Sequence, residues 1–442
     1  MNNKIIIFIT VLVFCLGAAV NISAAEAQNV IALDLTPYSR PEVQIERIVR
    51  NSNGNLMHII IPWREHMVYT ELPGGQGWWI PGGQPAQHVV NHNFTVNTLD
   101  GRGNVISSRE VPFELELTYA IYSGKNYHFV FFARSNVEEQ IGVEIMRIVK
   151  YDKEFNRLDA LSLFSSAGVG QTHSSTYYGN TVFPFLAPFG AVFAPGGRMT
   201  QNGDLLIVHM GRRVYDVAGH VYRIGEIHVA QLYLFVDINT MSLMPVQPPW
   251  ATRTREHFPL IHDDGRPVFM ELTEHDNPRE LVIHRGLTDV RESDMSYERT
   301  HLYRLSDDMW HGSAVELGGF GASDYNYIAT ARIRPTPTTD FPNLYVLIQP
   351  NDFNLPPHKV PLAVYESTTI HATLPQLIRL DNNRFVALWR EGTRSEEGYW
   401  VDLGFRVRYI DGNGNLSHEW VRHSNLNAAL SEIFMTERVL AN

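Results

Sequence analysis

The sequence predicts an all-β protein whose main part is a single β-propeller of six four-stranded blades. Short alternating apolar and polar stretches, separated by Gly, Asn, Asp and Pro, run along nearly the whole chain. Two kinds of turn follow one another in strict alternation, and no Pro/Ser-rich linker divides the chain. A seven-bladed propeller is the close alternative, and a β-sandwich or a pair of sandwich domains is the other.

The first kind of turn is a short polar pair that leads into an apolar strand. Its six instances are Asn53-Gly54, Ser123-Gly124, Asn202-Gly203, Asp264-Gly265, Thr339-Asp340 and Asn382-Asn383. Gly accepts positive φ, and Asn and Asp tolerate the left-handed conformation, so these pairs are typical of tight hairpins.

The second kind of turn follows an aromatic or aliphatic strand and begins with an acidic residue. Its instances are Asp100, Asp152, Asp237, Asp307, Asn351-Asp352 and Asp411. An Asp side chain accepts hydrogen bonds from backbone amides a few residues further on, which stabilises such turns. One pair of turns supplies the two hairpins of one four-stranded sheet, so six pairs predict six blades.

The sequence also predicts an element of secondary structure near each end of the propeller domain. Residues 29–40 are expected to add a strand to the last blade and so cover an open sheet edge. Residues 425–439 have the one clear amphipathic pattern and predict a short C-terminal helix.

The N-terminus reads as a secretory signal peptide over residues 1–27, followed by the propeller domain over residues 28–442. Lys4 precedes the apolar run 5–20, and Ala25-Glu26-Ala27 fits a cleavage site with small residues. The run is shorter than a bilayer span, so we expect cleavage and a secreted or periplasmic protein without a membrane anchor.

Composition excludes several classes of chemistry. The only cysteine, Cys15, lies within the signal peptide, so the mature chain has no disulfide, thiolate nucleophile or cysteine-bound metal. The net charge is −11 and no Lys/Arg-rich run occurs, which argues against nucleic acid or an anionic membrane as a partner.

Residues 149–285 contain most of the candidate functional side chains. Tyr151-Asp152-Lys153 is followed by Arg198-Met199, by the LLIVHMGRR stretch, by a His before a strand ending in Asp, by His-Phe, and by Asp-x-Pro-Arg. This order resembles a group of secreted bacterial propeller-like proteins that read YDKxWN, LRM, LxVHTxRxMY, HQ, SHSFNQ and DHGDxxPR. The resemblance implies the propeller fold and export, and it implies no assigned activity.

The site candidates in this region are His, Arg and Asp side chains near strand ends of adjacent blades. They are His209, Arg212, His228, His257, Asp276 and Arg279. In a propeller such positions meet on one face near the axis, where imidazoles and a carboxylate are able to bind a metal or exchange protons, and arginines to bind a carboxylate or sulfate. The competing interpretation is a lattice of buried polar side chains that joins the blades. No metal-binding spacing supports a particular metal or cofactor, and the sequence identifies no catalytic residue.

A second candidate is Trp78-Trp79 in a stretch rich in Gly and Pro. The two rings are candidates for a stacking platform for a sugar or peptide, or for a plug at a blade interface. The leading functional hypothesis is therefore a binding or scaffold module for an extracytoplasmic glycan, peptide or protein. The alternative is an enzyme, a polysaccharide lyase or hydrolase or a sulfuryl-transfer enzyme, that uses the His/Arg face.

Overall fold

The computed structural model describes the strands and most of the short turns. The described residues are 45–53, 55–61, 67–71, 77–81, 93–100, 104–115, 117–134, 143–164, 198–213, 229–244, 257–261, 266–272, 280–287, 297–304, 315–334, 343–365, 369–373, 375–395, 400–417, 421–424 and 429. The predicted signal peptide and the predicted closing strand 29–40 lie outside them. Within these ranges, no helix is long and apolar enough to cross a membrane.

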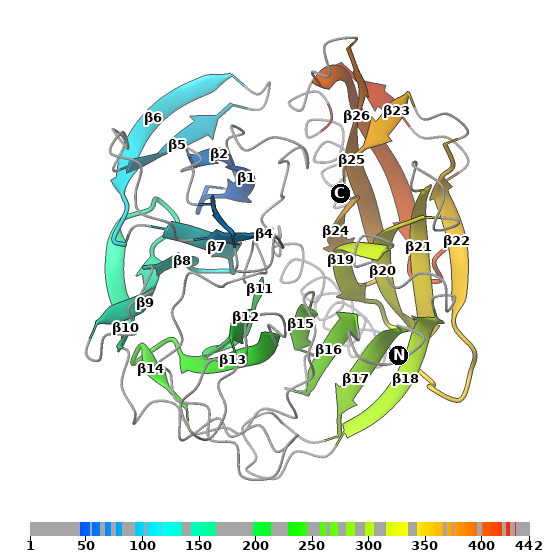
Figure 1. The fold of residues 1–442 in the computed structure, drawn as a ribbon, viewed down its shortest axis with the longest axis horizontal. Coiled ribbons are helices and arrows are strands. Elements are labelled where there is room, and N and C mark those ends of the chain that lie inside the picture. The colour runs from blue at the N-terminus through cyan, green and yellow to red at the C-terminus, as the bar shows by residue number, and fades with distance from the viewer. Residues whose placement is uncertain are drawn as a thin grey trace, which may run out of the picture.

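Six antiparallel sheets stand in a ring, which confirms the six-bladed β-propeller (Figure 1). Each blade is numbered by its order along the chain, and its strands follow one another from the centre outwards. Blade 1 contains β1 (Ile45–Arg50), β2 (Leu56–Ile61), β5 (Asn93–Leu99) and β6 (Val105–Pro112); blade 2 contains β7 (Leu117–Ser123), β8 (His128–Ala133), β9 (Glu144–Tyr151) and β10 (Arg157–Phe164); blade 3 contains β11 (Arg198–Asn202), β12 (Leu205–Arg213), β13 (Val229–Asp237) and β14 (Ser242–Leu243).

The second half of the chain forms the other three blades. Blade 4 contains β15 (His257–Ile261), β16 (Pro267–Leu272), β17 (Glu280–Gly286) and β18 (Tyr297–Arg304); blade 5 contains β19 (Val315–Ala322), β20 (Asn326–Ile333), β21 (Asn343–Pro350) and β22 (His358–Ala363); blade 6 contains β23 (Ile370–Ala372), β24 (Gln376–Asp381), β25 (Arg384–Arg394), β26 (Trp400–Asp411) and β27 (Val421–His423). In blade 6 the innermost position is shared, because β23 and β24 both pair with β25. A separate hairpin of β3 (Met67–Glu71) and β4 (Gly77–Pro81) pairs with no blade.

The hydrophobic core lies between neighbouring blades. All six residues of β8 are buried, and so are all six of β16, because a middle strand of a blade is covered on both faces. Continuous apolar runs are typical of strands covered in this way. Separate clusters join blades 1 and 2, 2 and 3, 3 and 4, 4 and 5, and 5 and 6. Between blades 6 and 1, Leu56 packs against the cluster of blade 6.

Five of the six Asp-led turns lie in the third-to-fourth connections of their blades, as predicted. Asp152 Oδ1 accepts a hydrogen bond from the backbone amide of Asn156 at 2.7 Å, and Asp152 Oδ2 accepts one from its side-chain Nδ2, also at 2.7 Å. The same pair of hydrogen bonds joins Asp100 to Asn104 and Asp411 to Asn415. The spacing Asp-x-x-x-Asn is therefore a repeated unit of the fold.

Two of the twelve predicted turn positions are wrong. Thr339-Asp340 lies between β20 and β21, the second and third strands of blade 5, and not between its first two strands. Asp307 follows β18 and lies between blades 4 and 5. The first hairpin of blade 5 instead turns at Ser323–Asn326, where Ser323 Oγ accepts hydrogen bonds from two following amides. This turn has no Gly or Asn-Gly pair, so the pattern missed it.

The predicted C-terminal helix is described at Ala429 alone. Ala429 is fully buried and packs against the hydrophobic cluster of blade 6. The rest of residues 425–439 lies outside the described residues.

Blades 5 and 6 approach each other closely at Gly319 of β19. A Cβ added there would lie 2.6 Å from the Cβ of Leu377 on β24. We expect Gly319→Ala to lower the free energy of unfolding by about 1–3 kcal/mol, because backbone must shift to admit the methyl group. Urea denaturation measures the loss. Gly203→Ala is the control: a Cβ there meets nothing within 4 Å, so only its positive φ of 58° is penalised. A Gly319 variant as stable as the parent would contradict the close approach.

Candidate functional site

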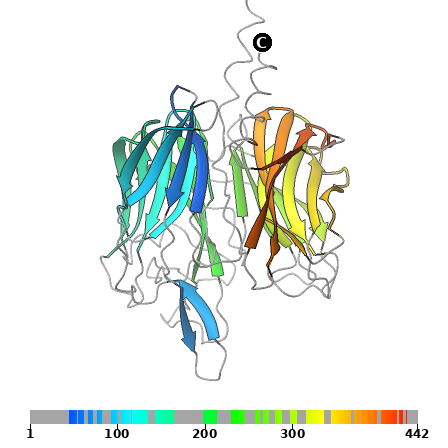
Figure 2. The same ribbon diagram turned by 90° about the horizontal axis from the view of Figure 1, so that it is seen from above.

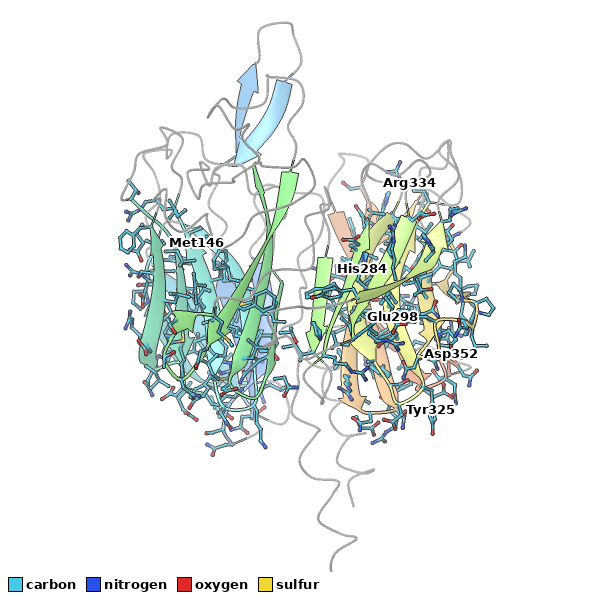
Figure 3. The ribbon with its side chains drawn as sticks, turned by 90° about the horizontal axis from the view of Figure 1, so that it is seen from below. Met146, His284, Glu298, Tyr325, Arg334 and Asp352 are labelled. Carbon is cyan, nitrogen blue, oxygen red and sulfur yellow. The ribbon has the colours of Figure 1, made fainter. Side chains whose placement is uncertain are left out.

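The two faces of the ring differ in their connections. The first-to-second and third-to-fourth strand connections of each blade lie on one face, which we call the turn face; Tyr325 and Asp352 mark it (Figure 3). The second-to-third connections and those between blades lie on the other, which we call the loop face; Arg334 marks it. The β3–β4 hairpin stands on the loop face, beyond the blades (Figure 2). Connections that a rigid scaffold holds out are the usual carriers of binding residues.

The hairpin carries Trp78 and Trp79, the aromatic candidates from the sequence. Both are residues of β4, and the register pairs Trp78 with Thr70 and Trp79 with Tyr69. The hairpin joins β2 to β5, the second and third strands of blade 1. Because the hairpin contributes no strand to a blade, the backbone hydrogen bonds of the described sheets form without it.

The candidates His209 and Arg212 lie on β12, the second strand of blade 3. His209 pairs with Arg198 of β11 on one side and with Tyr233 of β13 on the other. Arg212 pairs with Ala230, next to the end of β12 at the loop face. Arg212 therefore lies near the loop-face end of β12, as the sequence predicts, whereas His209 lies in the middle of the strand and not at its end as expected.

The candidate His257 is the first residue of β15, the innermost strand of blade 4. Strand β15 contacts both β11 and β12 of blade 3, so His257 and His209 belong to neighbouring strands of adjacent blades. Its partner in the register is Glu271 of β16. The remaining candidates, His228, Asp276 and Arg279, lie outside the described residues.

Glu271 forms a buried pair with His284 that the sequence analysis missed. Oε1 of Glu271 lies 2.7 Å from Nε2 of His284, and the two side chains are only 2% and 3% exposed. A buried carboxylate requires such a partner, because burial without one is costly. The signal in the sequence is an ionisable residue within each of two consecutive, mostly apolar strands: Glu271 in PVFMEL and His284 in ELVIHRG.

These positions form a candidate site in the inner half of blade 4. Two directly opposed residues of an antiparallel pair lie on the same face of the sheet with their Cβ atoms about 5 Å apart. His257 therefore occupies the position across from a carboxylate that already binds one imidazole. The Glu271–His284 pair is able to orient one of its groups for proton transfer or for binding a polar ligand, and the register places His257 next to it.

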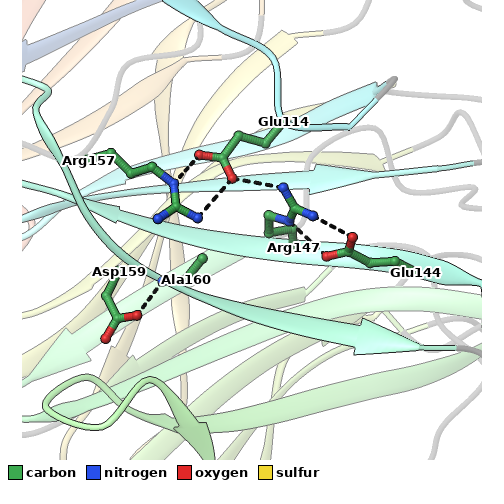
Figure 4. A network of polar contacts seen from close by, with 6 residues as sticks. All are labelled: Glu114, Glu144, Arg147, Arg157, Asp159 and Ala160. Atoms are coloured by element: carbon green, nitrogen blue, oxygen red, sulfur yellow. Dashed lines mark hydrogen bonds and ion pairs between the residues drawn. The ribbon is translucent and has the colours of Figure 1, made fainter.

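The competing lattice interpretation also has support, from other residues. Arg147 of β9 bonds Glu144 and Glu114, and Glu114 also bonds Arg157, so two arginines and two glutamates join the blade 1–blade 2 connection to blade 2 (Figure 4). Burial alone would raise the pKa of Glu144, but the hydrogen bonds from Arg147 and Ser162 lower it below its ordinary value. Polar bonds between blades also come from long cationic side chains to carbonyls: Lys150 to Ile238, Arg285 to Asn351, Arg332 to Ala372 and Arg408 to Leu362.

Metal binding gains no support from the described part of the chain, which contains no group of three or more His, Cys, Asp or Glu side chains placed to hold an ion. The fold and the loop-face positions define a six-bladed propeller with a candidate polar site on blades 3 and 4.

The comparisons with known proteins show that solved structures of other proteins resemble this chain in fold. No family model matches the sequence, and no curated protein matches it. Among solved structures, a protein of unknown function from Dyadobacter fermentans is 10% identical, with 86% of this chain and 98% of that chain covered and a TM-score of 0.45.

Two further structures are similar at the same level. The subtype N10 neuraminidase-like protein of A/little yellow-shouldered bat/Guatemala/060/2010 is 8% identical, covers 81% of this chain and 93% of its own, and has a TM-score of 0.40. An endo-arabinanase from Bacillus licheniformis is 12% identical, with coverages of 68% and 96% and a TM-score of 0.35.

Proposed function

We propose that this chain is an exported β-propeller that binds a saccharide on its loop face. The β3–β4 hairpin carries this proposal: it stands on the loop face, pairs with no blade, and concentrates Tyr69, Trp78 and Trp79 in ten paired residues. An isolated two-stranded hairpin is marginally stable in water, so an aromatic hairpin on a loop face is suited to packing against a bound ligand.

Aromatic rings suit a saccharide for a physical reason. The C–H groups on one side of a pyranose ring form an apolar surface that packs on a flat aromatic ring, while its hydroxyls keep contact with water or polar side chains. Export, predicted from residues 1–27, would place the protein where free polysaccharides occur. A peptide ligand is the other outcome that the test below distinguishes.

The test is a glycan and peptide array probed with the mature chain, followed by titration of the best ligand. Trp78→Ala and Trp79→Ala are each expected to weaken saccharide binding roughly 10- to 100-fold, because about 1.4–3 kcal/mol of apolar contact is lost. Tyr325→Ala is the matched control: Tyr325 is 58% exposed on the turn face, so its removal is expected to leave affinity unchanged.

Two results would contradict the proposal. One is saccharide binding that survives both Trp substitutions without loss. The other is an array on which peptides bind and saccharides do not, which would make the protein a peptide-binding propeller.

Catalysis is the second candidate function, and the Glu271–His284 pair opposite His257 favours it. In a lyase or hydrolase, a histidine near the loop face would exchange a proton with the bound saccharide, and Glu271 would orient it. The assay measures new reducing ends or unsaturated products from the saccharide found on the array. Activity that is lost in His257→Ala and kept in His358→Ala, a change at an exposed histidine of β22, would establish this function.

A further inference from the structure

Blade 6 has an apolar face on each side of its sheet. Along β25, Phe385, Ala387 and Trp389 belong to the cluster that blade 6 shares with blade 5. Val386 and Leu388 alternate with them, so they lie on the opposite face of the sheet, towards blade 1, which is the neighbour of blade 6 in the ring (Figure 1). The side of blade 6 that faces blade 1 is therefore apolar as well.

This second face is buried, although the described side chains of blade 1 contribute little to its cover. Six apolar side chains form it, and none is more than 7% exposed: Ile378, Leu380, Val386, Leu388, Phe405 and Val407. Among the side chains that the structure describes, Leu56 is the one apolar group of blade 1 that packs against them. The other five pairs of neighbouring blades each share a cluster with buried side chains from both blades. The joint between blades 6 and 1 is therefore packed differently from the others.

The opposing face of blade 1 is partly polar. Met57, Ile59 and Ile61 of β2 belong to the cluster with blade 2, so the residues between them face blade 6. One of these is His58, which pairs in the register with Asn97 of β5. The described side chains on this face of β2 and β5 are only half-buried: Leu56, His58, Ile60, Thr95 and Asn97. An apolar wall on blade 6 thus stands opposite a mixed wall on blade 1.

Ala429 identifies a segment that packs against the apolar wall. It is fully buried, its backbone is helical, and it belongs to the cluster of blade 6. It follows β27 of the same blade after residues 424–428. The segment around Ala429 is therefore anchored on the face of blade 6 that the described side chains of blade 1 leave largely uncovered.

The sequence around Ala429 has the pattern that suits two unlike walls. Apolar residues recur at positions i, i+3, i+4, i+7 and i+8 of one helical stripe: Leu426, Ala429, Leu430, Ile433 and Phe434. Ser431, Glu432 and Arg438 fall on the other side of such a helix.

The length of the stripe also matches the face that it would cover. The stripe from Leu426 to Phe434 would occupy about 13 Å of helix. The apolar face of blade 6 lies on three neighbouring strands, β24, β25 and β26, which are about 10 Å across.

We propose that residues 425–439 form an amphipathic helix that packs its apolar stripe on blade 6 and lies between the last blade and the first. The polar side of the helix then faces the mixed wall of blade 1, so one segment suits both sides of the joint. This inference rests on the blade 6 cluster and on Ala429, and it is independent of the proposed ligand.

The experiment is cysteine scanning of the chain from residue 28 onwards, which contains no cysteine, so that each introduced thiol is the only one. Leu430→Cys and Ile433→Cys are expected to react with a maleimide about 100-fold more slowly than Ser431→Cys and Glu432→Cys, because only the stripe is buried against blade 6. Tyr325→Cys gives the rate of an unprotected thiol, since Tyr325 is exposed on the turn face.

The pattern of protection tests the helix. Slow labelling at 430 and 433 with fast labelling at 431 and 432 follows the helical period and supports the proposal. Protection at alternate positions would indicate a strand, and rates at all four positions equal to that of Tyr325→Cys would indicate no docking; either result overturns the proposal. Protection that appears only in a dimer fraction would place the segment on a second copy of the chain and overturn it as well.

A second variant tests the position on blade 6. Val407→Ala removes apolar contact from the face in question and is expected to increase the labelling rate of Ile433→Cys about 10-fold. Val346→Ala is the matched control, because Val346 is equally buried but belongs to the cluster between blades 5 and 6. It is expected to leave the labelling rate unchanged. Equal rates in the two variants would place the stripe elsewhere and overturn the docking on blade 6.

Discussion

Replacement of Glu391 by alanine is expected to lower the free energy of unfolding by about 3–5 kcal/mol, one of the largest losses for a single site in this chain. Glu391 of β25 is 3% exposed. Its Oε1 accepts hydrogen bonds from Tyr365 Oη at 2.9 Å and from Trp389 Nε1 at 3.3 Å, and its Oε2 accepts one from Arg406 Nε at 2.8 Å.

The expected size follows from what the substitution leaves behind. Arg406 would remain as a largely buried guanidinium without this carboxylate, and Tyr365 would lose the acceptor for its hydroxyl proton. Burial, and next the charge of Glu391, raise the pKa of Tyr365 far above its ordinary value, so this hydroxyl is a donor at every working pH. Tyr365 lies in the connection from blade 5 to blade 6, so the substitution is expected to weaken the packing between these two blades.

Guanidinium chloride denaturation, followed by tryptophan fluorescence, measures the change. Glu110→Ala is the control, because Glu110 is exposed on β6 and accepts a bond from Thr95; its loss is expected to cost less than about 1 kcal/mol. Equal losses in the two variants would show that the buried network does not contribute to stability.

Acid is expected to destabilise blade 2 through His128. Burial, and next the charge of Lys153, lower the pKa of His128 from 6.5 to about 3. Between these two values the unfolded chain binds a proton that the folded chain does not, so stability is lost as the pH falls from 6.5 towards 3. The full contribution is roughly 5 kcal/mol, and about 3 kcal/mol of it is expected to be lost at pH 4.

His128→Phe tests this expectation. The imidazole of His128 stacks on Phe155 with ring centroids 4.4 Å apart, and a phenyl ring keeps that contact without a titratable group. The Phe variant is therefore expected to lose about 3 kcal/mol less than the parent between pH 7 and pH 4, measured by urea denaturation at each pH. Parallel stability curves for the two proteins would show that His128 titrates normally.

Much of the architecture could be predicted because its signal is local. Ten of the twelve turn positions came from Asn, Gly and Asp chemistry, and that chemistry acts within four or five residues, as the Asp152–Asn156 bonds show. The error at Thr339-Asp340 comes from blade 5, whose first hairpin turn is stabilised differently. Ser323, which the pattern does not single out, bonds the amides of its own turn and the carbonyl of Gly412 in the next blade.

The candidate site was predicted only in part, because its geometry depends on contacts between strands. The sequence predicted that His209, Arg212 and His257 lie at strand ends of adjacent blades. The structure places them on β12 and β15 of blades 3 and 4, with His209 in the middle of its strand. Their binding role stays a prediction. The Glu271–His284 pair was missed, because an ion pair across two strands depends on a register that alternation alone does not determine.

The composition of the first and last sheets has a mechanical consequence. Blade 1 is made of β1, β2, β5 and β6, and blade 6 is made of β23 to β27, so no described sheet contains strands from both ends of the chain. Leu56 against the blade 6 cluster is side-chain packing and not a shared ladder of backbone hydrogen bonds. Within the described residues, side-chain packing therefore forms the joint between blades 1 and 6, and a strand from residues 29–40 paired with blade 6 would add backbone hydrogen bonds to that joint.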